Sequence, residues 1–84
     1  MSYELFVLRR AQKELADLSK TDFERVRDAV VALAQNPRPV GCKKLVGRDG
    51  WRIRSGDYRV IYTIFDAVLI VAIEGIRHRR EVYR

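Results

Sequence analysis

The sequence predicts an α+β fold in which a two-helix hairpin packs on one face of a small, mainly antiparallel sheet. Three observations predict it: a short apolar segment near the start, two amphipathic helical patterns in the first half, and period-two alternation in the second half. With 84 residues the chain should form a single domain, residues 1–84, around a modest core. The expected order of elements is β-α-α-β-β-β.

The first strand is expected at residues 3–8, which mix aromatic and β-branched side chains with one charge and should be mostly buried. A helix follows, because Ala11, Leu15 and Leu18 recur on one side of an otherwise polar segment. This first helix should end at about residues 19–20.

The second helix is marked by a capping box, since Thr21 and Glu24 have the spacing at which a hydroxyl and a carboxylate satisfy each other's backbone N–H groups. It should therefore begin near Asp22. Asn36 and Pro37 should stop it, because proline disfavours helical geometry in the preceding residue. Its apolar face is formed by Phe23, Val26, Val30 and Leu33.

Residues 38–50 contain glycines and a proline, which predicts a loop with a short strand around residues 44–46. The rest of the chain is predicted to be sheet. Residues 51–54 alternate with period two, Gly56 and Asp57 supply a turn, and residues 58–65 resume the strand pattern.

A further turn is expected at Asp66, followed by an apolar run at residues 68–73 that is typical of a central strand covered on both faces. The helical hairpin can bury its apolar stripes on only one sheet face. Basic side chains should therefore gather on the free face and at its edge.

The positive charge is concentrated in the second half of the chain. Residues 41–84 hold ten Lys or Arg against five Asp or Glu, whereas residues 1–40 hold seven against six, for a net charge of +6. This imbalance indicates a polyanionic partner: nucleic acid most often, otherwise an anionic membrane surface or an acidic protein. Thirteen arginines against four lysines favour phosphate, which the planar guanidinium binds in a bidentate manner.

Three arginines are candidates for binding phosphate. Arg52 and Arg54 are two residues apart and should project from the same strand face, and Arg59 follows across a tight turn. Trp51 and Tyr58 could stack on bases but are more often core residues at such positions.

One cysteine, Cys42, and one histidine, His78, give no cluster spaced for zinc or iron, so we expect no metal and no cofactor. The apolar run at residues 67–73 falls far short of the roughly 20 residues that a membrane span needs. With no signal-peptide pattern, the sequence predicts a cytoplasmic protein without a membrane partner.

Two residues could transfer protons. His78 has an ordinary pKa of about 6.5, near neutrality, although a single histidine is more often a polar surface residue. Tyr83 could anchor the tail onto the sheet, or it could act as a base if neighbouring arginines lower its pKa from about 10.

At WRIRSGDYRVIYTI (51–64) and REVYR (80–84) the chain resembles the RelE/ParE toxin superfamily, and most closely its RelE branch. The resemblance covers nearly the whole chain and includes the element order, the turn with Gly56, Tyr58 and Arg59, and the closing E-V-Y at residues 81–83. It implies a RelE-like fold and a toxin that enters the ribosomal A site, contacts rRNA and cuts the mRNA there. It also implies a cognate antitoxin protein as partner.

Carried over residue by residue, the resemblance assigns the catalytic site of a metal-independent endoribonuclease to Arg52, Arg54, Arg59, Arg77 and Tyr83. The candidates for the proton donor are His78 and a ribosomal or solvent group. Around this site we expect RNA contacts from Lys43, Lys44, Arg79 and Arg80. Well-known relatives carry lysines where this chain has Arg52 and Arg54, and an arginine cannot serve as a general acid. The superfamily also includes DNA gyrase inhibitors, so a non-nuclease binding toxin is the alternative.

Overall fold

The computed structural model describes residues 2–80. Its elements are β1 (Glu4–Val7), α1 (Arg9–Ala16), α2 (Lys20–Ala32), β2 (Lys43–Lys44), β3 (Trp51–Ser55), β4 (Tyr58–Phe65), the short 3₁₀ helix η1 (Asp66–Val68) and β5 (Ile70–His78). Within this part of the chain, neither α-helix is long and apolar enough to cross a membrane.

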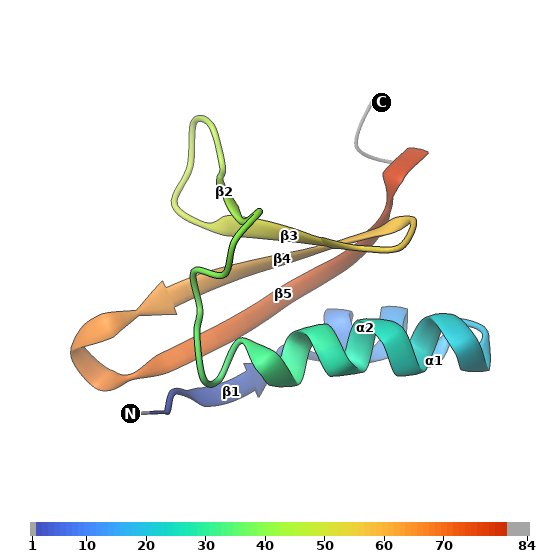
Figure 1. The fold of residues 1–84 in the computed structure, drawn as a ribbon, viewed down its shortest axis with the longest axis horizontal. Coiled ribbons are helices and arrows are strands. Elements are labelled where there is room, and N and C mark those ends of the chain that lie inside the picture. Colours follow the sequence, from blue (N-terminus) through green and yellow to red (C-terminus); the bar gives the residue numbers. More distant parts are fainter. Residues whose placement is uncertain (1, 81–84) are drawn as a thin grey trace.

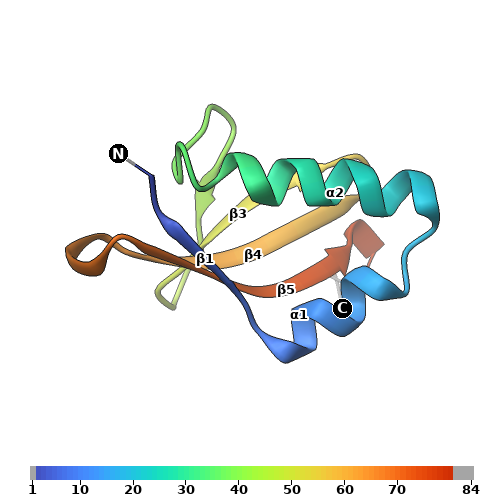
Figure 2. The ribbon, with the colours of Figure 1, turned by 90° about the horizontal axis from the view of Figure 1, so that it is seen from below.

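The strands form one sheet in the order β1-β5-β4-β3-β2 (Figure 1). β1 pairs with β5 in parallel, and the remaining neighbours are antiparallel. Figure 1 shows both helices below the sheet and therefore on the same side of it, and Figure 2 shows the loop that joins them into a hairpin. The predicted α+β fold, with one sheet face left uncovered by helices, is therefore confirmed. We call that uncovered side the open face.

The boundary between the helices differs from the prediction, because the cap of α2 is Ser19 and not Thr21. Ser19 has an extended backbone, and its Oγ accepts the backbone N–H of Asp22 at 3.3 Å. The helix consequently starts at Lys20, and α1 already ends at Ala16. Ser19 and Thr21 each precede an acidic residue by three positions, as a capping residue does. The structure uses Ser19, the earlier of the two.

The C-terminal end of α2 also differs from the prediction, which extended the helix to Asn36. The α-helix ends at Ala32, and the N–H groups of Leu33, Ala34 and Gln35 then bond three residues back, each at 3.1 Å. This tighter 3₁₀ geometry is common at helix ends. These 3₁₀ turns continue to Gln35, just before Pro37, the residue that was expected to stop the helix.

The last strand departs most from the prediction. It begins at Ile70 and not at Val68, because η1 and Leu69, which has a left-handed φ of 54°, form the preceding turn. A β-bulge lets it continue past residue 73 to His78. Helices cover one of its faces, so Ile70 and Ala72 on the open face are only half-buried. The expectation of a strand covered on both faces was wrong.

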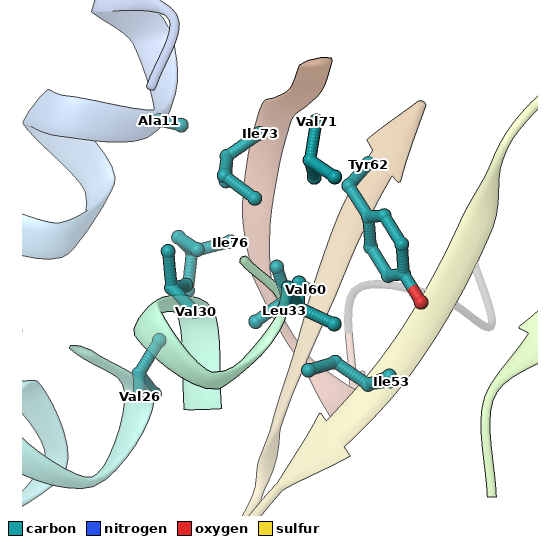
Figure 3. Packing of buried hydrophobic residues seen from close by; sticks show 10 residues of the cluster. All are labelled: Ala11, Val26, Val30, Leu33, Ile53, Val60, Tyr62, Val71, Ile73 and Ile76. Atoms are coloured by element: carbon teal, nitrogen blue, oxygen red, sulfur yellow. The ribbon is translucent and has the colours of Figure 1, made fainter. Parts of the chain in front are cut away.

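The hydrophobic core lies between the helices and the sheet (Figure 3). The core side chains are Ala11, Val26, Val30, Leu33, Ile53, Val60, Tyr62, Val71, Ile73 and Ile76. Three of the four residues predicted for the apolar face of α2 belong to it, and the fourth, Phe23, is half-buried. Tyr62 is fully buried, and its hydroxyl donates to the carbonyl of Pro37 at 2.7 Å. β1 is an edge strand with alternating exposure, in contrast to the mostly buried strand expected; Phe6 is 49% exposed.

A polar cluster ties the loop after α2 to the far end of the sheet. Asp66 accepts hydrogen bonds from the Tyr3 hydroxyl at 2.7 Å and from both terminal nitrogens of Arg38, at 2.8 and 3.2 Å. The guanidinium of Arg38 also lies over the Trp51 ring, 5.2 Å from its centroid. The hydrogen bonds from Arg38 and then Tyr3 lower the pKa of Asp66 to about 2.

We expect this cluster to make stability fall at acid pH. The folded-state pKa of Asp66 lies below its ordinary value of 3.8, so the ionised carboxylate stabilises the fold above about pH 4, and this contribution is lost as the pH falls toward 2. Asp66→Asn should therefore lower the melting temperature at pH 6, with the difference from wild type shrinking between pH 4 and 2. The matched control is Asp49→Asn, at an exposed loop carboxylate. A difference that is independent of pH would contradict the assignment.

Candidate phosphate-binding site

Strands β3, β4 and β5 bring three arginines into one row across the open face. Arg54 lies opposite Arg59, and Arg59 lies opposite Arg77. Directly opposite residues share a sheet face, so the side chains of these arginines project on the side away from the helices.

The tight turn between β3 and β4 needs Gly56, whose φ is 61°. Like charges placed side by side cost stability unless an anion compensates them.

A second cross-strand row lies beside the first. Lys43 is opposite Arg52, and Arg52 is opposite Ile61. The prediction that Arg52 and Arg54 share a face is therefore confirmed, and Lys43 joins them there. Lys44 is opposite Trp51 and so has the other orientation, at the edge of the sheet.

Arg59 lies at the centre of the first row and is only 3% exposed. It lines a hollow of about 350 Å³. Among the described residues, the lining is Arg54, Gly56, Asp57, Tyr58, Arg59, Arg79 and Arg80. Four guanidinium groups against one carboxylate give this hollow a strong preference for an anion, and guanidinium donors suit phosphate oxygens.

Arg77 belongs to the row by register, but its side chain takes a different direction. It pairs with Glu14 of α1 and lines a separate hollow of about 320 Å³ with Arg10 and Arg48. Gly75 makes this possible, because a Cβ at that position would lie 2.8 Å from Nη1 of Arg77. The four predicted arginines are thus neighbours on one face, while their side chains line different hollows.

A third hollow, of about 510 Å³, lies at the edge of β3. Its lining combines apolar groups of α2 and the following loop with basic groups of the sheet: Ala29, Ala32, Pro39, Val40, Gly41, Lys43, Arg52, Ile53 and Arg54. This mixed surface suits a partner that carries both apolar and acidic side chains.

The two candidate proton-transfer residues are placed differently from the arginines. His78 follows Arg77 in β5 and therefore projects from the opposite face, where its ring meets Tyr58 edge-on with centroids 5.3 Å apart. Its Nδ1 accepts the backbone N–H of Arg80 at 3.2 Å. Tyr83 lies outside the described residues.

Sequence reasoning missed Glu14, Arg10 and Arg48 as neighbours of the site. The spacing of Arg10 and Glu14 was visible as a helical i, i+4 pair. No local signal links Glu14 to Arg77, which is 63 residues away. Within residues 2–80, no three His, Cys, Asp or Glu side chains are grouped as metal ligands would be.

Comparison with known proteins places the chain among toxins. The family model described as the ParE toxin of the type II toxin–antitoxin system parDE matches residues 5–83. A Methanocaldococcus jannaschii protein with the provisional name toxin RelE1 is 28% identical over 88 residues, which span 100% of this chain and 98% of the relative.

Solved structures agree with this placement. The isolated RelE toxin of E. coli matches with 30% identity and a TM-score of 0.80, over 98% of this chain and 92% of that one. The archaeal RelE–RelB complex of Pyrococcus horikoshii matches with 29% identity and a TM-score of 0.83, over 94% of this chain and 97% of that one.

Proposed function

The chain belongs to the RelE/ParE superfamily of type II toxin–antitoxin toxins, and from this premise we propose that it is a ribosome-dependent endoribonuclease that cleaves mRNA in the A site and so inhibits translation. One observation carries the proposal. The hollow above the buried Arg59 is lined by four arginines and has room for a phosphodiester group. In this proposal the open face binds the scissile phosphate of a single-stranded substrate.

The proposed chemistry uses the 2′-hydroxyl of the substrate as the nucleophile and needs no metal. A base removes the proton of this hydroxyl, the 2′-oxygen bonds to the adjacent phosphorus, and the bond from phosphorus to the 5′-oxygen breaks. An acid returns a proton to the leaving 5′-oxygen. Charge builds up on the phosphorane oxygens between these steps, where fixed cations stabilise it.

In this proposal Tyr83 is the base, and Arg52, Arg54, Arg59 and Arg77 stabilise the developing charge. Lys43, Lys44, Arg79 and Arg80 contact the RNA around them. His78 projects from the other face of β5, so we assign the proton donor to a ribosomal or solvent group. Arginines at 52 and 54 supply charge and a bidentate fork but no transferable proton.

We also propose that a cognate antitoxin neutralises the toxin. The P. horikoshii relative was solved as a RelE–RelB complex, and the hollow at the edge of β3 offers an apolar and basic surface for such a protein. Action on translating ribosomes implies that the toxin works in the cytoplasm. The family model carries the name of ParE, which makes gyrase inhibition the second candidate.

The test is a map of mRNA ends by primer extension after brief induction. We expect new ends within minutes, confined to the translated frame and located at codon-defined positions. A matched transcript that lacks its start codon should remain intact. DNA breaks and filamentation without new RNA ends would support the gyrase inhibitor, and cuts in the untranslated transcript would disprove ribosome dependence.

A further inference from the structure

Glu14 joins α1 to β5 where β5 extends beyond its parallel neighbour. The pairing of β1 with β5 ends at Val7 and Ile73. Past that point, Oε1 of Glu14 accepts the backbone N–H of Ile76 at 2.9 Å. Oε2 of the same carboxylate accepts a hydrogen bond from Nη1 of Arg77 and forms an ion pair with it. One side chain thus fixes both the strand edge and the arginine beside it.

The guanidinium of Arg77 is held from several sides. Glu14 contacts Nη1, the carbonyl of Ile76 accepts a weak hydrogen bond from the same nitrogen at 3.4 Å, and Gly75 leaves space beneath the group. The side chains of Arg77 and Glu14 are 23% and 26% exposed. Arg77 also lines the 320 Å³ hollow on the open face, which is large enough for a phosphate group; Glu74 lies in the same lining, paired with Arg48.

We propose that Glu14 is a positioning residue that orients Arg77 for the scissile phosphate or the one next to it. An arginine can adopt many rotamers, and holding it at Nη1 reduces the reorganisation needed when phosphate charge develops. Arg10 adds little to this geometry, since its Nε is 3.8 Å from Oε2 and its side chain is 72% exposed. The inference rests on the proposed nuclease function.

The charge of Glu14 and its positioning of Arg77 should affect different kinetic quantities. Removing the negative charge of Glu14 from a basic surface should leave RNA binding unchanged or make it tighter. Loss of orientation should instead lower the rate of the chemical step. A change at Glu14 should therefore lower kcat without raising KM.

The first experiment is Glu14→Gln in a ribosome-programmed cleavage assay. Glutamine keeps an oxygen for the Ile76 N–H but loses the ion pair with Arg77. We expect kcat to fall about 10- to 100-fold with KM unchanged or lower. In an Arg77→Ala background the same change should cause no further loss, because the two residues act as one unit. Glu24→Gln makes the same charge change at an exposed site on α2 and should leave kcat unchanged.

The second experiment measures Arg77 directly and needs no activity. NMR of ¹⁵N-labelled protein reports rotation of the Arg77 guanidinium about its Nε–Cζ bond, which should be slow in wild type and faster in Glu14→Gln. Equal rotation rates, or an equal loss of kcat with and without Arg77, would overturn the inference. If wild type cleaves nothing, the nuclease proposal fails, and the rotation rates alone decide whether Glu14 positions Arg77. Glu14→Asp, which keeps the charge on a shorter side chain, replaces the glutamine variant if that variant does not fold.

Discussion

Replacing Arg59 with alanine will lower the rate of ribosome-programmed mRNA cleavage by about 10²–10³-fold, the usual effect of removing one donor that stabilises transition-state charge. Arg59 occupies the middle of the cross-strand row, between Arg54 and Arg77, and is almost fully buried. Water screens a charge less at such a site, so its guanidinium should contribute more than that of an exposed arginine. Single-turnover cleavage of a defined codon on a programmed ribosome measures the effect.

Two variants separate this effect from a general loss of charge or fold. Arg27→Ala removes an arginine exposed on α2 and should cleave at the wild-type rate. Arg59→Lys keeps the charge but loses the bidentate fork, so its rate should lie between those of wild type and the alanine variant. Thermal unfolding shows whether each variant is folded at the assay temperature. A folded Arg59→Ala protein with full activity would exclude the row as the catalytic site.

Tyr83→Phe is expected to have the second large effect, because it removes the proposed base and leaves the aromatic ring. General base catalysis contributes typically about 10²–10⁴-fold, so cleavage should slow by that range while RNA binding changes little. The wild-type rate should rise with pH as the phenol ionises, and the phenylalanine variant should lack this rise. Cleavage followed across pH 6–9 measures both quantities.

The control for this change is Tyr3→Phe. It also removes a phenol hydroxyl, which in Tyr3 donates to Asp66 at the far end of the sheet. It should alter stability without altering the pH dependence of cleavage. Equal rates for wild type and Tyr83→Phe would assign Tyr83 to the alternative role of anchoring the tail.

Much of the fold could be predicted from local patterns. The apolar stripe of α2 and the alternation in β3 and β4 each follow from residues close together in sequence. The tight turn at Gly56 also fixes the register of the flanking strands, which is why Arg54 and Arg59 could be expected on one face. These parts of the site depend on short-range geometry.

Other features depend on packing between distant segments. Two hydroxyls compete to cap α2, and sequence alone does not rank Ser19 above Thr21. The contact between Glu14 and Arg77 depends on where α1 crosses β5. The position of His78 on the far side of the strand depends on the bulge in β5, which has no simple sequence signature.

That bulge determines which of the β5 side chains after Ile73 face the core and which lie on the open face. Ile73 is opposite Tyr62 and Ile76 is opposite Val60, so both isoleucines face the core although they are three residues apart. Strict alternation from Ile73 would place Arg77 inward and Ile76 outward. If β5 paired with β4 without the bulge, the unchanged sequence would therefore turn the end of the strand over and exchange a core isoleucine for a buried arginine. Glu74, which has no partner in the register with β4, takes up the extra residue in the bulge and so keeps the basic side chains at this end of the sheet on the open face.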